Sequence, residues 1–419
     1  MKSLLVALLL AAPAPAAAAC TAIINATVHG PDGRSNDPVV LDDGLVADPA
    51  GLAKPDRAAG TIAWGDRTCT FVDGAGKHLS AGFVDAVTQL GLVEVSTEGG
   101  SRDQDAGGDP IRADHVVVDT YNPRSTLIPV TRIEGTTTAL VHPSGGLLPG
   151  KVGAVQLAGG TQREAVASAF VALPFNLNAR PSRAAALGWL REVFDDARDR
   201  GTWDRSRRSQ PDANPRDLAA VRSVLQGDKA LLVAADRASD LEALIRFAQD
   251  EKVRIVIDGG AEGWLLAKEL AAAQIAVIVD PIVYGPGSFD QIHGRADNAA
   301  LLAAAGVDVI IASHSAHFAR GLRQLAGNAV RGGLDHAAAM AAITSTPARV
   351  FGLSDRGALE PGRRADAVLW SGDPLELSTS VQALWIGGRS VALESRQTQL
   401  LERYRTTPGT PLPPLALPQ

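Results

Sequence analysis

The chain has 419 residues, a net charge of −6 and 46% hydrophobic residues, a composition that suits a globular protein with a large core. Its charges are interspersed, without a basic stripe that would neutralise phosphates, which argues against nucleic acid as a partner. The length exceeds that of one small domain and fits a barrel of roughly 250 residues with an accessory domain.

Residues 1–19 have the pattern of a secretory signal peptide. Lys2 is followed by a short apolar run from Leu4 to Ala12 and then by small residues at Ala17 and Ala19. The run is shorter than the ~20 residues that a membrane span needs. We therefore expect an exported protein, periplasmic or secreted, without a transmembrane span. A buried N-terminal helix is the alternative.

Cleavage after residue 19 leaves Cys20 as the first residue, and two fates are then open to it. One is a lipid anchor, although Ala17, three positions earlier, is smaller than the aliphatic residue usual in lipid-attachment signals. The other is a disulfide with Cys69, the only other cysteine, because an oxidising compartment permits pairing. We favour the disulfide. Neither cysteine has a plausible activating base nearby, so catalysis by cysteine is not expected.

The segment after the signal has the pattern of short β-strands. Residues 21–28, 39–47 and 68–79 are apolar runs separated by glycine and aspartate turns. A similar texture returns at 357–376 and 381–391. We expect residues 20–80 and 357–395 to pair as one small β-sandwich, and the proline-rich residues 396–419 to form an extended tail.

Between these ends, apolar β runs alternate with alanine-rich amphipathic stretches. The clearest runs are 230–236, 253–260, 275–281 and 307–313, each followed by a helical or turn pattern. Residues 83–87, 136–143, 153–159 and 165–173 supply four more. This alternation predicts an α/β fold in which residues 81–356 form a TIM-like (β/α)8 barrel of parallel strands. An open doubly wound sheet is the alternative.

Three stretches carry a resemblance to a known family. They are Gly82–Asp85 at the start of the predicted barrel, residues 359–368 (LEPGRRADAV), and residues 385–389 (WIGGR). In order and separation they resemble the amidohydrolase superfamily, in its imidazolonepropionase-like branch. The resemblance implies hydrolysis of C–N bonds other than peptide bonds, with one or two divalent metals at the C-terminal mouth of the barrel.

The same resemblance implies metal ligands at defined positions, and these positions do not hold them here. A His-x-His pair on the first strand falls on Val87 and Gln89, and the histidines of strands five and six fall on Ala234 and Gly259. The aspartate of strand eight falls on Ser313 or His314, and the bridging lysine or glutamate has no counterpart within 165–173. We therefore predict a degenerate metal site and no metal cofactor.

Polar residues near the predicted strand ends are the remaining site candidates, because such residues line the mouth of a barrel. His314 and His317 are three apart, which on a helix would place both on one face to chelate a metal or to hold a general base, with Asp258 nearby. Arg132 and Arg320 suit an anionic group. Helix capping and ion pairs are the alternatives for several of these residues. The catalytic candidates are His314, His317 and Asp258; the pocket candidates are Asp85, Gln89, Arg132, His142, Asp236 and Arg320.

Two functional hypotheses follow from the sequence. The first is an exported amidohydrolase-like protein whose metal site is degenerate. The second is a catalytically inactive pseudoenzyme that binds a small molecule at the barrel mouth. The sequence leaves open which substrate or ligand is bound, whether catalysis survives, and the oligomeric state.

Overall fold

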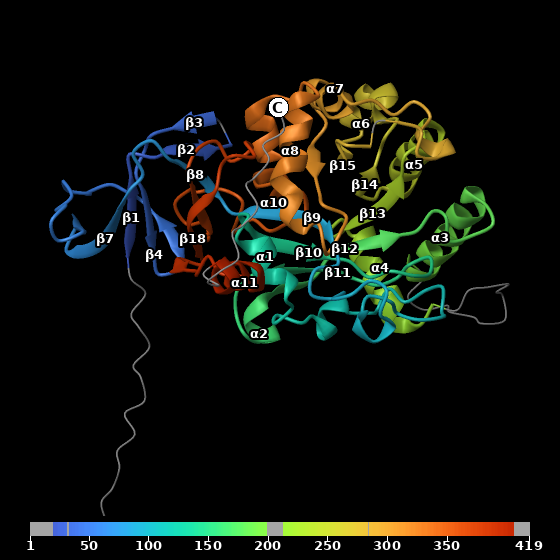
Figure 1. The fold of residues 1–419 in the computed structure, drawn as a ribbon. Coiled ribbons are helices and arrows are strands. Elements are labelled where there is room, and N and C mark those ends of the chain that lie inside the picture. The colour runs from blue at the N-terminus through green and yellow to red at the C-terminus, as the bar shows by residue number, and fades with distance from the viewer. Residues whose placement is uncertain (1–19, 32, 199–212, 284, 406–419) are drawn as a thin grey trace, which may run out of the picture.

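The computed structural model describes residues 20–31, 33–198, 213–283 and 285–405 (Figure 1). The predicted signal peptide lies outside the described residues. Among those described, no helix is long and apolar enough to cross a membrane.

The central feature is an eight-stranded sheet that curls into a nearly closed barrel. Its strands follow chain order, and each is hydrogen-bonded to the next: β9 (Phe83–Thr88), β10 (Thr136–Val141), β11 (Val152–Gln156), β12 (Val166–Phe175), β13 (Ala230–Ala235), β14 (Ile255–Gly259), β15 (Ala276–Val279) and β16 (Val309–Ile311). Just beyond β16, the amide of His314 donates to the Val87 carbonyl of β9 at 2.9 Å, which brings the first and last strands together. The barrel prediction is confirmed, and the open-sheet alternative is wrong.

One strand runs against the predicted direction. β11 pairs antiparallel with both β10 and β12, whereas the other strand pairs of the barrel are parallel. The reason lies in the connections. Residues 142–151 contain no helix, and residues 157–165 contain only the one-turn α2 (Gln162–Ala165). A parallel return needs a crossover of a dozen or more residues, so these shorter links reverse the chain instead.

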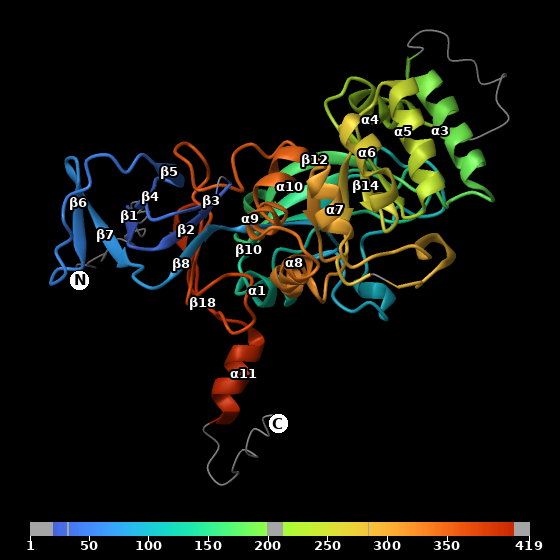
Figure 2. The same cartoon turned by 90° about the horizontal axis from the view of Figure 1, so that it is seen from above.

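Helices pack around the strands of the second half of the barrel (Figure 2). α4 begins with Asn214 and Asp217 in a capping box and with Pro215 at its first position, which satisfies amides that a helix start leaves free. Apolar side chains between strands and helices form the largest core cluster. The helices of the barrel are α1 (Leu127–Arg132), α3 (Arg183–Arg198), α4 (Pro215–Leu225), α5 (Ala238–Glu251), α6 (Ala267–Ala272), α7 (Asn298–Ala304), α8 (Leu322–Arg331), α9 (His336–Ala341) and α10 (Ser345–Val350).

Two further sheets lie beside the barrel. One, in the order β5-β4-β1-β7-β6, is built wholly from the N-terminal segment; the other, β19-β18-β17-β8-β2-β3, joins both ends of the chain through the pairing of β8 with β17. The expected pairing of the two ends is therefore confirmed. The strands are β1 (Thr21–Ile24), β2 (Thr27–Gly30), β3 (Gly33–Ser35), β4 (Val39–Asp42), β5 (Leu45–Ala47), β6 (Thr61–Trp64), β7 (Arg67–Asp73), β8 (His78–Ala81), β17 (Ala367–Trp370), β18 (Val381–Ile386) and β19 (Arg389–Ser390).

A buried aromatic pair joins the second sheet to the barrel. The fully buried Trp370 stacks on Phe83, with ring centroids 5.3 Å apart, and its indole N–H donates to the Ser80 hydroxyl at 2.9 Å. Phe83 is the first residue of β9. Residues from the C-terminal segment thus complete the packing around the first barrel strand.

The predicted extended tail is wrong in its first part. Residues Arg396–Arg405 form helix α11, which stands away from the body in Figure 2. This stretch contains neither glycine nor proline, and Ser395 exchanges hydrogen bonds with Thr398 at its start. The proline-rich residues 406–419 lie outside the described residues.

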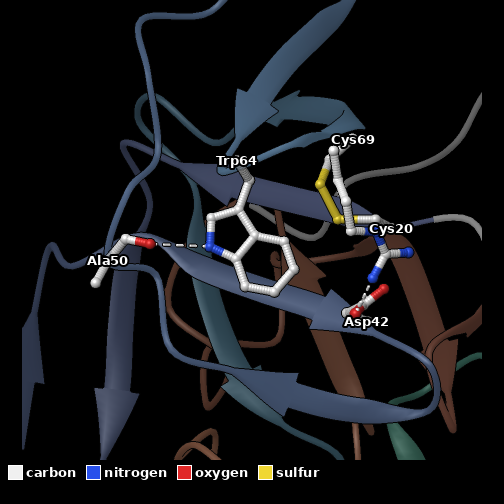
Figure 3. Close-up of a disulfide and its surroundings, with 6 residues drawn as sticks. Cys20, Asp42, Ala50, Trp64 and Cys69 are labelled. Atoms are coloured by element: carbon white, nitrogen blue, oxygen red, sulfur yellow. Dashed lines mark hydrogen bonds and ion pairs between the residues drawn. A yellow bond between two sulfur atoms is a disulfide. The ribbon is translucent and has the colours of Figure 1, made fainter.

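A disulfide joins Cys20 to Cys69 within the N-terminal sheet (Figure 3). A lipid thioether on Cys20 would use the same sulfur, so the disulfide and the anchor exclude each other. We predict that the mature protein from its native host has no alkylatable thiol until it is reduced, and that its intact mass is lower by two hydrogens before reduction. A mass increase equal to a diacylglyceryl group at residue 20 would contradict this.

Candidate functional site

A cavity of about 240 Å³ opens at the carboxyl ends of strands β13 to β16. Asp236 follows β13, Asp258 lies within the end of β14, Asp280 follows β15 and His314 follows β16; all four line this mouth cavity. Strands that run parallel end at the same edge, so residues distant in sequence meet there. The mouth cavity is where a small ligand has access to ionisable groups.

His314 and Asp258 form the closest ionic contact in the mouth cavity. Nε2 of His314 lies 2.6 Å from Oδ1 of Asp258, and Nδ1 lies 3.2 Å from the Ala312 carbonyl oxygen. Both partners are acceptors only, so both ring nitrogens must donate a proton. The geometry therefore describes a positively charged imidazolium rather than a free base.

Electrostatics support the same charge state. Burial alone would lower the pKa of His314, but the hydrogen bond and charge of Asp258, with the charges of Asp85 and Asp280, raise it to about 9. The backbone of His314 is left-handed, with φ of 53°, a conformation that residues other than glycine rarely adopt. This conformation lies in an irregular segment between β16 and the next helix.

His142 has the opposite charge state. It follows β10, is 8% exposed, and donates from Nε2 to the Ala86 carbonyl oxygen at 2.8 Å. Burial lowers the pKa of His142 to about 4, so its ring is neutral at pH 7. The two histidines of this region are thus one cation and one neutral ring.

Asp85 is wholly buried within β9 and is held by Ser313. The Ser313 amide donates to Oδ1 of Asp85 at 3.0 Å, and the Ser313 hydroxyl donates to Oδ2 at 2.5 Å. Burial raises the pKa of Asp85 to about 6, against the lowering effect of these two hydrogen bonds. Both carboxylate oxygens are engaged in joining β9 to the chain after β16, which is a structural role.

The segment after β15 folds back over the mouth cavity. Gln291 donates from Nε2 to Oδ2 of Asp236 at 2.8 Å, while the Ala261 amide donates to Oδ1 at 3.1 Å. The neighbouring Asp290 forms an ion pair with Arg183 of α3. Burial raises the pKa of Asp236. Asp236 therefore connects the floor of the mouth cavity to the segment that covers it.

Six of the predicted site residues do not line the mouth cavity: Asp85, Gln89, Arg132, His142, His317 and Arg320. His317 is exposed and donates from Nε2 to the Glu94 carbonyl oxygen at 3.0 Å, and residues 313–318 form no helix, so His314 and His317 do not share a face. Arg132 lies in α1 and donates to the Leu157 carbonyl oxygen at 3.1 Å, which is a structural contact. Gln89 is partly buried beyond β9 and does not line the mouth cavity.

The structure also gives the places of Arg320, a predicted pocket residue, and of Asp280 and Gln291, which were not site candidates. Arg320 lines a neighbouring cavity instead of the mouth cavity. Asp280, which its sequence context describes as a turn residue, lines both cavities. Its position directly after a predicted strand was a usable signal. Gln291 had none, because it ends a single turn of 3-10 helix (Phe289–Gln291) within a long connection whose course the sequence does not specify.

A family model matches part of the chain, and solved structures match its fold. The profile described as "Amidohydrolase family" matches residues 266–392. An amidohydrolase from Thermotoga maritima has the same fold, with a TM-score of 0.76, 22% identity, and coverage of 89% of this chain and 99% of that one. The C-terminal third of the chain thus matches the model of the amidohydrolase family, and the fold of the whole chain is that of a solved amidohydrolase.

Other similar proteins have lower sequence identity over most of the chain, or match over a smaller part of it. A zinc-bound adenosine deaminase from Xanthomonas campestris aligns with a TM-score of 0.51 and 14% identity, over 93% of this chain and 98% of that one. An adenine deaminase from Methanoregula boonei is 42% identical over 80 residues, which are 19% of this chain. The match spans only 13% of the length of that deaminase.

The donor groups at this barrel mouth do not fit the metal centre that the resemblance to amidohydrolases implies. Metal ligands need free lone pairs that converge on one point. Here His314 donates from both ring nitrogens, and both oxygens of Asp85 accept from Ser313. Throughout the described ranges, no three His, Cys, Asp or Glu side chains are arranged to hold a metal ion.

The backbone at one lost ligand position also opposes a histidine. Gly259 has φ of 109°, and a Cβ atom there would lie 2.5 Å from Oδ1 of Asp236. A side chain at 259 would therefore require both a strained backbone and movement of Asp236. The glycine fits the present arrangement of the mouth cavity and not the superfamily's ligand at this position.

Proposed function

We propose that this amidohydrolase-superfamily protein binds a small molecule at the barrel mouth and lacks the superfamily's metal-dependent hydrolysis. The observation that carries the proposal is the pairing of donor groups within the protein. Both oxygens of Asp85 accept from Ser313, and His314 is held as a cation by Asp258 and the Ala312 carbonyl. Groups engaged in this way do not activate a metal-bound water, but they do shape a preformed cavity.

Hydrolysis of a C–N bond without the binuclear centre is the second candidate function. It is supported by superfamily membership and by His142, a neutral imidazole near the charged pair of Asp258 and His314. A neutral ring can accept a proton during attack by water. Named relatives act on adenine and adenosine, so these are the first compounds to assay.

We further propose that the protein works outside the cytoplasm, in the periplasm or the medium. The signal-like residues 1–19 and the disulfide between Cys20 and Cys69 support this location, because disulfides persist in oxidising compartments.

Metal content tests the proposed function directly. Protein purified without added metal is expected to contain less than about 0.1 equivalent of zinc, manganese, iron, nickel or cobalt, because the residues that the structure describes include no convergent ligand set. The measurement is elemental analysis of the mature protein, repeated after incubation with zinc and removal of the excess. One equivalent of metal that survives this treatment would contradict the proposal.

If metal is retained, two variants identify its position. His314→Ala removes the imidazolium of the mouth cavity, and His317→Ala removes a histidine that lies outside it. Loss of metal only in the first variant would place the ion at the mouth cavity. Turnover of adenine or adenosine by the metal-free protein, abolished by His142→Phe, would favour the second candidate function.

A further inference from the structure

We propose that the ligand of this site has a basic nitrogen head that enters the mouth cavity and an apolar arm that lies against Ile282 and Phe318. This inference deepens the proposed function and rests on it. It follows from the shape and chemistry of a second cavity next to the first.

The second cavity, called here the side cavity, has a volume of about 560 Å³. It shares Asp280 with the mouth cavity, and its walls include Ser313 and Ser315, the neighbours of His314 in the chain. The two cavities therefore adjoin at Asp280, which directly follows β15. In the proposed binding mode, the ligand spans both cavities by passing Asp280.

The side cavity has exposed apolar side chains on one wall. Phe318 is 71% exposed and Ile282 is 53% exposed, and both line the cavity together with Leu325. Large apolar side chains on the loops of a barrel mouth gain free energy when an apolar group covers them. The charged side chains of this cavity, apart from Asp280, are Glu134 and Arg320, which have opposite signs. This chamber suits an uncharged apolar arm.

The mouth cavity has an excess of negative charge for the head. Three carboxylates line it, those of Asp236, Asp258 and Asp280, against the single imidazolium of His314. Arg295 also lines it, but its guanidinium is paired with Asp297 at 2.6 Å. The imidazolium of His314 is already one cationic group among the carboxylates that line the mouth cavity. A ligand ammonium would find a carboxylate partner of the same kind at Asp280, which lines both cavities.

The experiment compares ligands that differ only in head or arm. Calorimetric titration of the metal-free protein with n-butylamine, n-pentylamine and n-hexylamine is expected to show about three- to fourfold tighter binding for each added methylene. Hexanoate and 1-hexanol, with the same arm and a different head, are expected to bind at least about tenfold more weakly than hexylamine.

Variants assign the two parts of the ligand. Phe318→Ser is expected to remove most of the dependence on chain length, whereas Phe289→Ser is the matched control because Phe289 is 88% exposed and lines neither cavity. Asp280→Asn is expected to weaken hexylamine about tenfold and to leave hexanol unchanged.

Three outcomes would overturn the inference: binding that does not depend on arm length, preference for hexanoate, or equal effects of Phe318→Ser and Phe289→Ser. Absence of amine binding up to millimolar concentration would also overturn it. Metal content then separates the two proposals. If less than about 0.1 equivalent of metal is present, only the ligand class is wrong; if one equivalent is bound, the proposed function fails as well.

Discussion

Asp258→Asn is expected to destabilise the protein by about 2–3 kcal/mol at pH 6 and by far less near pH 10. The pKa of His314 is about 9 in the folded state and 6.5 in the unfolded reference, so the folded state binds the proton more tightly. This stabilisation is fully present below pH 6.5 and is lost as the pH rises through 9. Most of it comes from the hydrogen bond and charge of Asp258, which the amide does not supply.

The measurement is urea unfolding of the wild type and the variant at both pH values. Asp297→Asn serves as the control, because Asp297 belongs to a solvent-exposed ion pair with Arg295 and its loss should cost little. Proton NMR of the His314 ring gives an independent test, since its pKa should fall in Asp258→Asn. An equal cost of Asp258→Asn at pH 6 and pH 10 would show that the pair is not ionic.

Asp85→Asn is expected to gain stability relative to the wild type by about 2.4 kcal/mol as the pH rises from 4 to 8. Burial raises the pKa of Asp85 from 3.8 to about 6, so the folded state favours the protonated carboxyl. The wild type loses this stabilisation as the pH rises from 3.8 through 6. Asparagine is neutral at every pH and keeps an oxygen that accepts from the Ser313 amide.

The quantity to compare is the difference in unfolding free energy between wild type and variant across this pH range. Asp48→Asn is the control, because Asp48 is an exposed carboxylate directly after β5. A difference for Asp85→Asn that does not change with pH would mean that Asp85 ionises as easily when folded as when unfolded.

The barrel could be predicted because its signal is repeated. Each of the four runs from 230 to 313 is an apolar strand followed by a helical or turn pattern, and β13 to β16 occupy those positions. The direction of β11 does not follow from this repeated signal, because it depends on the connections on each side of the strand. Both connections are shorter than the crossover that a parallel strand needs.

The candidate site could be predicted only where side chains belong to strand ends. Asp258 and His314 are 56 residues apart in sequence, but both lie at the carboxyl ends of strands in one parallel set. Their proximity could therefore be predicted. The pairing of His314 with His317 was wrong because it assumed a helix, whereas the backbone at His314 is left-handed. Gln291 ends a single turn of 3-10 helix and Phe318 directly precedes another, and turns this short have no periodicity from which side-chain direction could be predicted.

The stacking of Trp370 on Phe83 has a consequence for how the chain reaches its native state. A nascent polypeptide that ends before residue 370 lacks the aromatic surface that covers the first barrel strand, and it also lacks β17, the partner of β8. Early portions of the chain therefore cannot lock into the final arrangement by themselves. A barrel that can close only when residue 370 is present leaves the polypeptide unfolded until nearly all of it has crossed the membrane, which suits the proposed export.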